Sequence, residues 1–467
     1  MNSVHNVERD TYRLIVTRRN ASEILLLASG HAWSLPAVEI SREQRVAEQL
    51  TRTFQVATGL QAYCLFVPKS AASDRTPRCA KYAAMEVLNQ NDRAPSRTFW
   101  IPSAVATRES IRPADDSVAI KQLLKELSSY VRQPNTGPFA KPGWFRELLE
   151  WVHERIDPLR LRLTGGFLQV NASPAFSLIR LETKSSAVWF KATGQPNLHE
   201  LPISVSLARL FPEFTPPLLG VHSSWNGWLS QEVSRTTLDD FVDLSDWRKA
   251  ADSLAQLQIR SIGKDAELRE SRCKDLRLDK LIEEIDPFLA RMAELMATQK
   301  KRVPAALTNS ELTVLGERLK DACSLLQELG LPDTLGHMDL SPSNILISPE
   351  RCVFLDWAEG CVTNPFITFE YLREHLQRAW TNNARAVEST VAAYMRPWQS
   401  VLSPEVLKQA MVVSPLVAVF AYAVASNGWR SPESASQPPL AGYLRGLTRR
   451  MYREGVLIVG RSERCLV

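Results

Sequence analysis

The sequence lacks the features that mark secreted, zinc-binding or nucleic-acid-binding proteins. Its seven cysteines are scattered and form no CxxC pair, so we expect reduced thiols rather than a zinc site or a disulfide framework. The 56 Lys/Arg and 51 Asp/Glu residues are interleaved, without a long basic block that would follow a phosphate backbone. The start, MNSVHNVERDTYRLIV, lacks the basic and apolar segments of a signal peptide. These absences predict a cytoplasmic protein that binds no nucleic acid.

Long apolar runs are also missing. The most apolar stretch, MVVSPLVAVFAYAVA (411–425), is shorter than the roughly 20 residues that span a bilayer, and it contains Pro415. It predicts a buried helix and a protein without a membrane segment.

What is present is an ordinary globular composition, with 45% hydrophobic and 23% charged residues over 467 positions. At about 150 residues per domain, this length predicts two or three units. Residues 11–130 alternate short strand-like runs with two helical stretches, which indicates a mixed α/β domain. The Pro- and Gly-containing segment RQPNTGPFAKPGW (132–144) predicts a linker.

Beyond this segment the pattern changes from a helix to a small sheet and then to helices. WFRELLEWVHERI predicts a helix, and FLQV, FSLIRLET and AVWFKAT predict an antiparallel meander. Past Leu238 the sequence predicts mostly amphipathic helices. We expect one of these helices to start at an N-cap Ser310 and to stop at Gly330. The predicted organisation is α+β, with domains over 1–131, 145–235 and 236–467 and the linker over 132–144.

The segment GHMDLSPSNILI (336–347) breaks an apolar, strand-like run with polar residues. Together with RCVFLDW it predicts a hairpin with His337, Asp339, Asn344 and Asp356 at its mouths. An acidic side chain on a fixed loop deprotonates or orients a hydroxyl, whereas Asn and a second Asp are hard oxygen ligands for magnesium. A lone HxD would more often be a turn with local backbone bonds. Here four polar residues, His337, Asp339, Asn344 and Asp356, fall at the ends of the predicted strands, and this combination favours a catalytic site.

This spacing, HxDxxxxN followed by an Asp one hairpin later, is that of the protein kinase catalytic loop. HMDLSPSNILI with VFLDW resembles the aminoglycoside phosphotransferase and choline kinase family over roughly residues 140–460. The resemblance implies a bilobal kinase-like fold, ATP (or GTP) and Mg²⁺ as cofactors, and phosphoryl transfer to a small hydroxylated molecule. It also implies that Asp339 is the base, that His337 braces the loop, and that Asn344 and Asp356 hold the metal.

The same resemblance asks for a phosphate-binding lysine and a helical carboxylate upstream. Lys191 in AVWFKAT and Glu200 in NLHELPISVSLARL occur in that order, although each alone is an ordinary strand-end lysine or first-turn acid. Backbone groups near Glu232 and Val233 occupy the place of the adenine-binding hinge. The turn QVNASPAF lacks the glycines of a phosphate loop, and Asn171 and Ser173 are its candidate donors.

The acceptor is not expected to be a polycationic aminoglycoside. The sequence from Pro365 onward contains twelve Lys/Arg and seven Asp/Glu, whereas a pocket for a polycation requires clustered carboxylates. A neutral or anionic hydroxylated molecule fits better.

The front domain has a resemblance of its own. EILLLASGHAWSLPAVEISREQRVAEQLTRTFQVATGL (23–60) is similar to the outline of a Nudix hydrolase, which implies an α/β/α fold. The core glutamates of that family are replaced here by Thr53, Val56 and Ala57, and without carboxylates the helix cannot assemble the metal site. The resemblance implies a degenerate, non-hydrolytic domain that binds a ligand or a partner.

Three hypotheses stand at this point. The first is a small-molecule kinase. The second is a pseudokinase or nucleotide-binding regulatory protein with a ligand-sensing front domain. The third is a Nudix-type pyrophosphohydrolase, which would require metal bound near Glu43 or Glu48.

Overall fold

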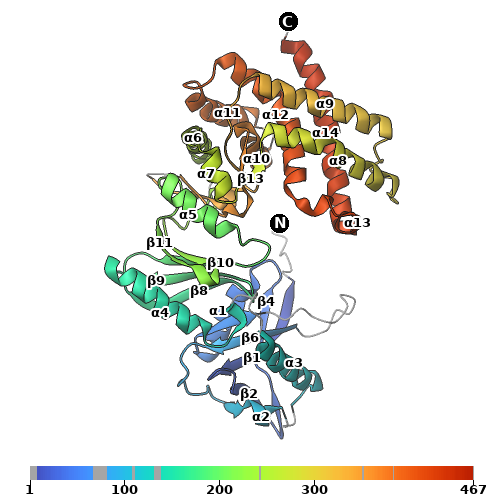
Figure 1. Cartoon of the computed structure of the whole chain (residues 1–467). Helices are drawn as coiled ribbons and strands as arrows, with labels where there is room; N and C mark the ends of the chain where they lie inside the picture. The colour runs from blue at the N-terminus through green and yellow to red at the C-terminus, as the bar shows by residue number, and fades with distance from the viewer. Residues whose placement is uncertain are drawn as a thin grey trace, which may run out of the picture. The chain divides into compact units, whose positions relative to one another are not determined.

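The computed structural model describes residues 8–66, 81–107, 111–130, 138–240, 243–349, 352–381 and 383–465. The chain divides into two compact units (Figure 1). The first unit comprises Met1–Leu201 and Pro217–Glu232, and the second comprises Pro202–Pro216 and Val233–Val467.

The first unit begins with a seven-stranded mixed sheet, here called the front sheet. Its strands are β1 (Arg9–Arg18), β2 (Glu23–Ser29), β3 (Ala32–Ser34), β4 (Ala37–Ser41), β5 (Ala62–Phe66), β6 (Lys81–Val87) and β7 (Thr98–Pro102). β1 pairs in parallel with β6 and antiparallel with β2 and β4. The accompanying helices are α1 (Val46–Thr58), α2 (Ser103–Ala106) and α3 (Ala114–Tyr130).

Alternation along the strands places helices on both faces of the front sheet. Leu14 and Val16 of β1 belong to one buried cluster with Phe54 of α1. Ile15, between them, belongs to another cluster with Ile120 of α3, because successive strand side chains point to opposite faces. The front sheet thus has the α/β/α layering that was predicted, whereas its relation to Nudix hydrolases stays a prediction.

The first unit also contains an antiparallel five-stranded sheet in the order β11-β12-β10-β9-β8. Its strands are β8 (Leu163–Ser173), β9 (Phe176–Thr183), β10 (Val188–Thr193), β11 (Leu218–His222) and β12 (Gly227–Gln231). The predicted meander is confirmed as β8, β9 and β10, while β11 was not anticipated. Helix α4 (Trp144–Ile156) has the predicted bounds and lies beside this sheet in Figure 1.

The front sheet and the five-stranded sheet share one buried core. Tyr63 of β5 stacks on Phe145 of α4 with ring centroids 4.8 Å apart, and both belong to a cluster with Phe190 of β10. Buried Gln169 of β8 accepts a hydrogen bond from the Cys64 backbone N–H at 2.7 Å and donates one to the Cys64 carbonyl at 2.8 Å. The side-chain amide of Gln169 therefore satisfies the backbone N–H and carbonyl of Cys64, as the backbone of a neighbouring strand would.

A buried carboxylate fixes the start of α4. Glu86 of β6 accepts hydrogen bonds from the Gly143 backbone N–H at 2.6 Å and from the Tyr63 hydroxyl. Burial raises the pKa of Glu86. Gly143 has φ +90°, and a Cβ there would lie 3.2 Å from Arg146, so glycine suits this position. Whether 132–144 acts as a linker stays a prediction, and residues 131–137 lie outside the described ranges.

The second unit is mainly helical. Most of α5 (Glu200–Leu210) belongs to it, followed by α6 (Leu244–Arg260), α7 (Asp265–Glu270), α8 (Leu278–Ala297), α9 (Asn309–Glu328), α10 (Pro365–Ala379), α11 (Ala384–Trp398), α12 (Pro404–Ala425), α13 (Pro432–Ser436) and α14 (Pro438–Cys465). Its short strands are β13 (Lys274–Leu276), β14 (Thr334–His337), β15 (Ile345–Ile347), β16 (Cys352–Phe354) and β17 (Gly360–Thr363). They form the sheet β13-β17-β14 and the hairpin β15-β16.

One predicted helix boundary was wrong by two residues. Thr308, not Ser310, caps α9, because its hydroxyl accepts from the Glu311 N–H while the Glu311 carboxylate accepts from the Thr308 N–H. This reciprocal capping box satisfies two donors that Ser310 could not reach from inside the helix. Gly330, with φ +66°, lies just beyond the helix end as predicted.

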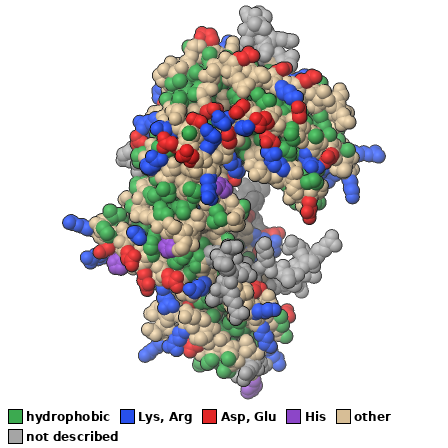
Figure 2. All heavy atoms as spheres, in the orientation of Figure 1, with side chains coloured by type: hydrophobic (Ala, Val, Ile, Leu, Met, Phe, Trp, Pro, Cys, Tyr) green, Lys and Arg blue, Asp and Glu red, His purple; other side chains and the backbone are tan. Residues whose placement is uncertain are grey.

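Helix α12 contains the apolar stretch. By length and composition alone, with a mean hydropathy of 1.6, it could cross a membrane, but 67% of that window is buried inside the structure. Leu416, Val417 and Phe420 belong to the core cluster of the second unit, as the predicted buried helix requires. On the face shown in Figure 2, acidic and basic side chains are interspersed.

The cysteines follow the prediction where their side chains are described. They are free and buried: Cys64, Cys273, Cys323, Cys352 and Cys361.

Candidate active site

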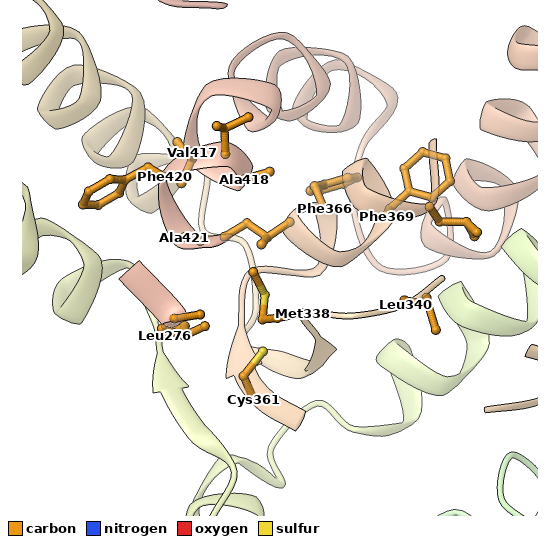
Figure 3. Close-up of a cluster of buried hydrophobic side chains, with 14 of the residues drawn as sticks. Leu276, Met338, Leu340, Cys361, Phe366, Phe369, Val417, Ala418, Phe420 and Ala421 are labelled. Atoms are coloured by element: carbon orange, nitrogen blue, oxygen red, sulfur yellow. The ribbon is translucent and has the colours of Figure 1, made fainter. Parts of the chain in front are cut away.

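The segment 336–347 forms the end of β14, a loop, a short 3-10 helix over Pro342–Asn344 and the strand β15. Met338 and Leu340 are buried, and Figure 3 shows them in a cluster with Phe366 and Phe369 of α10. Asp339, between them, is exposed. The apolar neighbours thus hold the loop down while the Asp339 side chain faces out.

The buried side chain of His337 connects two segments of the chain by hydrogen bonds. Its Nδ1 accepts from the Asp339 backbone N–H at 3.1 Å, so Nε2 carries the proton and donates to the Leu355 carbonyl at 2.9 Å. Its own backbone N–H donates to the Thr368 hydroxyl at 3.0 Å. Burial lowers the pKa of His337. A neutral imidazole therefore links the loop to the residue before Asp356.

Asn344 is held in a specific orientation. Its amide nitrogen donates to the Asp339 carbonyl at 2.9 Å, and its backbone carbonyl accepts from the Leu355 N–H at 2.8 Å. The side-chain amide oxygen is then the atom left to act as a ligand. Asp356 follows Leu355 in a left-handed conformation, φ 61° and ψ 60°, which Asp tolerates better than most residues. Both are oxygen donors of the kind that Mg²⁺ prefers, together with waters and phosphates.

Tyr371 of α10 also contacts Asp339, a contact that sequence reasoning missed. Its hydroxyl donates to Asp339 Oδ1 at 3.1 Å across 32 residues. No local pattern in NPFITFEYL marks this tyrosine, and only the fold brings it to the loop.

The first unit contains the predicted lysine and carboxylate. Lys191 of β10 forms an ion pair with Glu200, the first residue of α5. Glu200 is buried and Lys191 only slightly exposed. The Lys191 ammonium also lies 5.7 Å from the ring centre of Trp228, its partner on β12. The pair predicted from order alone is therefore in contact.

The turn between β8 and β9 remains without glycine, but Gly194 after β10 lies close to it. A Cβ on Gly194 would lie 2.7 Å from the Ala175 carbonyl oxygen. The Ser173 hydroxyl makes only a long contact, 3.5 Å, to the Phe176 carbonyl, and Asn171 is partly buried in β8 beside a register shift. Their predicted role as phosphate donors stays a prediction.

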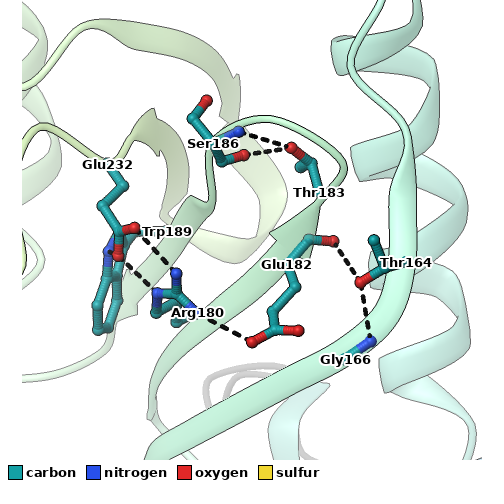
Figure 4. A network of polar contacts seen from close by, with 8 residues as sticks. All are labelled: Thr164, Gly166, Arg180, Glu182, Thr183, Ser186, Trp189 and Glu232. Carbon is teal, nitrogen blue, oxygen red and sulfur yellow. Dashed lines mark hydrogen bonds and ion pairs between the residues drawn. The ribbon is translucent and has the colours of Figure 1, made fainter.

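Glu232 is already engaged by neighbours (Figure 4). Its carboxylate accepts from Arg180 at 2.5 and 2.9 Å and from the Trp189 indole at 3.2 Å. Its backbone N–H donates to the Ala187 carbonyl at 3.0 Å. The chain passes from the first unit to the second between Glu232 and Val233. Their predicted adenine contacts stay a prediction, and the Glu232 N–H is not free to supply one.

The helix compared with the Nudix motif carries no metal-binding face. Val56 is 82% exposed, and Ala57 is exposed beside it. Among the described residues, no three His, Cys, Asp or Glu side chains gather closely enough to hold a metal ion. Glu43 and Glu48 therefore belong to no such group in the described ranges.

Comparison with solved structures gives weak similarity at low sequence identity. No protein-family model and no curated protein matches the sequence. Among solved structures, Plasmodium vivax ethanolamine kinase has a TM-score of 0.44 at 15% identity, covering 65% of this chain and 88% of its own. Choline kinase from Streptococcus pneumoniae has a TM-score of 0.43 at 13% identity, and the match covers 65% of this chain and 99% of the choline kinase. Macrolide 2'-phosphotransferase from Brachybacterium faecium has a TM-score of 0.42 at 15% identity, and the match covers 63% of this chain and 98% of the phosphotransferase. At these values the similarity carries no argument about activity, which rests on the residues.

Proposed function

We propose that this protein is a small-molecule kinase that transfers the γ-phosphoryl group of ATP, or GTP, to a hydroxyl of an acceptor. The observation that carries the proposal is the loop of the second unit. There the exposed Asp339 and the oriented amide of Asn344 are joined by hydrogen bonds through His337 and Leu355. Asp356, in a left-handed conformation, directly follows Leu355. A loop with a purely structural role would not require an exposed carboxylate at Asp339 together with the oxygen donors of Asn344 and Asp356.

Each residue has a task in the proposed reaction. Asp339 accepts the proton of the acceptor hydroxyl while the oxygen of that hydroxyl bonds to the γ-phosphorus. The bond between the γ-phosphorus and the β,γ-bridging oxygen breaks, and its electron pair stays on ADP. Asn344 and Asp356 would hold Mg²⁺, which supplies charge neutralisation. Lys191, fixed by Glu200, positions the phosphates. In such reactions catalysis is mostly positioning and electrostatics.

The proposed acceptor is a small, neutral or anionic hydroxylated molecule, and the proposed location is the cytoplasm. The alternative is a pseudokinase that binds nucleotide or a partner, with the front domain as a ligand sensor. The glycine-free turn between β8 and β9 favours that alternative, because backbone amides approach phosphates most closely at glycine.

The test is phosphoryl transfer from MgATP to a pool of cell metabolites, followed by mass spectrometry of the products. We expect Asp339→Asn to lower product formation by roughly 10² to 10⁴-fold, since general-base catalysis contributes about that much. Asp356→Asn should be as harmful, because Asn also tolerates the left-handed backbone but lacks the charge.

The matched control is Asp321→Asn, which removes an exposed carboxylate from α9 and should leave the rate unchanged. Product formation that is equal in wild type and Asp339→Asn would exclude the kinase. ATP-dependent thermal stabilisation without any product would favour the pseudokinase.

A further inference from the structure

Asp339 receives one hydrogen bond on its carboxylate from the described part of the chain, and that bond comes from Tyr371. The donor lies on α10, one helical turn beyond Thr368, whose hydroxyl accepts from the His337 backbone N–H. Positions three apart lie on the same face of a helix. One face of α10 therefore contacts the loop twice, once at its backbone and once at its carboxylate.

The ring of Tyr371 is itself held. It stacks on Tyr422 of α12 with centroids 5.5 Å apart and an interplanar angle of 29°, and it contacts His375 at 5.1 Å on the next turn. Tyr422 in turn meets Tyr443 of α14 edge-on at 6.3 Å. Aromatic contacts of this kind restrict the ring torsions. The Tyr371 hydroxyl is thus pointed at Asp339 before any ligand binds.

The start of α10 is equally well fixed. The Asn364 side chain caps the helix by accepting from the Phe366 N–H at 3.0 Å, and Pro365 occupies the first turn. Buried Glu370, next to Tyr371, pairs with Arg373. A helix anchored in this way can act as a rigid support for the catalytic carboxylate.

We propose that Tyr371 is a positioning residue for Asp339. Its hydroxyl holds Oδ1 and limits rotation of the carboxylate, so that Oδ2 is the oxygen that takes the acceptor's proton. This inference rests on the proposed function, because the acceptor hydroxyl is part of it. Burial raises the pKa of Tyr371, so the phenol stays a donor over the physiological range.

Other ionisable groups act on the same pair and stay in place in the test. They are His337 of β14, His375 of α10 and Tyr422 of α12, and through His375 also Asp239 and Arg378. Tyr371→Phe removes none of these side chains, although Tyr422 loses the Tyr371 hydroxyl as a neighbour.

The test compares Tyr371→Phe with Tyr443→Phe. Both remove one phenol oxygen from the same stack, but only the first oxygen touches Asp339. Carbon-13 NMR of labelled aspartate carboxyls at one fixed pH reports the Asp339 carboxyl, identified by the signal missing in Asp339→Asn. We expect the chemical shift of this signal to change in Tyr371→Phe, which lacks the hydroxyl that donates to Oδ1, and to stay unchanged in Tyr443→Phe.

Steady-state kinetics supply the second readout. A looser carboxylate should lower kcat by about tenfold in Tyr371→Phe while KM for ATP stays constant, because orientation rather than nucleotide binding is lost. An Asp339 carboxyl signal or a kcat that is the same in Tyr371→Phe as in wild type overturns the positioning role. Failure of the proposed function looks different: wild type and Asp339→Asn would then form equal amounts of product, whatever the NMR signal of Asp339 does.

Discussion

At the scale of single residues, His337 combines burial with two ring hydrogen bonds. Burial lowers its pKa from the ordinary 6.5, so the unfolded chain binds a proton more readily than the folded protein does. The free energy of unfolding contributed by this residue is therefore complete above about pH 6.5 and falls as pH drops through that value. His337 links acid sensitivity of the fold to the loop that carries Asp339.

This linkage can be measured by urea unfolding at pH 8, 7, 6 and 5. We expect His337→Asn to be less stable than wild type at pH 7 by about 1–3 kcal/mol, because the ring hydrogen bonds are lost. The difference should shrink toward pH 5, since only wild type loses this term on acidification. His153→Asn, on the exposed side of α4, should follow wild type throughout. A His337→Asn difference that is constant with pH would contradict the argument.

At the scale of elements, Gln169 joins two sheets. Its buried amide serves both backbone groups of Cys64, 105 residues away. Gln169→Leu would leave a buried N–H and a buried C=O without partners, which costs about 1–3 kcal/mol each. We expect the free energy of unfolding of the first unit to fall by about 2–6 kcal/mol, measured by denaturant unfolding. Gln61→Leu is the matched control, because its amide makes only an exposed contact, 3.4 Å, to the Gly165 carbonyl. Equal losses for both variants would refute a joining role.

Elements with a long, regular pattern were predictable, and so was the short hairpin of β15 and β16, whereas the other short strands of the second unit were not. α4 was predicted over its full length because apolar residues recur at helical spacing across thirteen positions. β13, β14 and β17 have three or four residues each and exist through pairing with one another, which sequence periodicity does not report.

The contacts of the candidate site likewise include some that were predictable and some that were not. The Lys191–Glu200 contact was predictable because both residues stand in a recognisable order on a strand and the following helix. Tyr371 and Gln169 were not, since their partners are 32 and 105 residues away and no spacing rule connects them. Local motifs therefore predicted which residues carry the proposed chemistry, whereas the contacts that orient them required the fold.

At the scale of the whole molecule, the buried cores follow the two units. The clusters that contain Ile15 and Leu14 involve residues of the first unit, and the cluster that contains Leu319 involves residues of the second. The front sheet and the five-stranded sheet share a core and should unfold together. Separate cores allow separate cooperative transitions, as is common in multidomain chains.

Differential scanning calorimetry of the full chain should therefore resolve two transitions. Leu148→Ala in α4 and Leu319→Ala in α9 each empty a fully buried position, at a cost of about 2–5 kcal/mol. We expect Leu148→Ala to lower the Tm of one transition and Leu319→Ala that of the other, each by several degrees. Added MgATP then shows which unit binds nucleotide, because a bound ligand raises the Tm of the transition of the unit that binds it. If both variants shift a single transition equally, the two cores unfold as one, and the division into independent units is wrong.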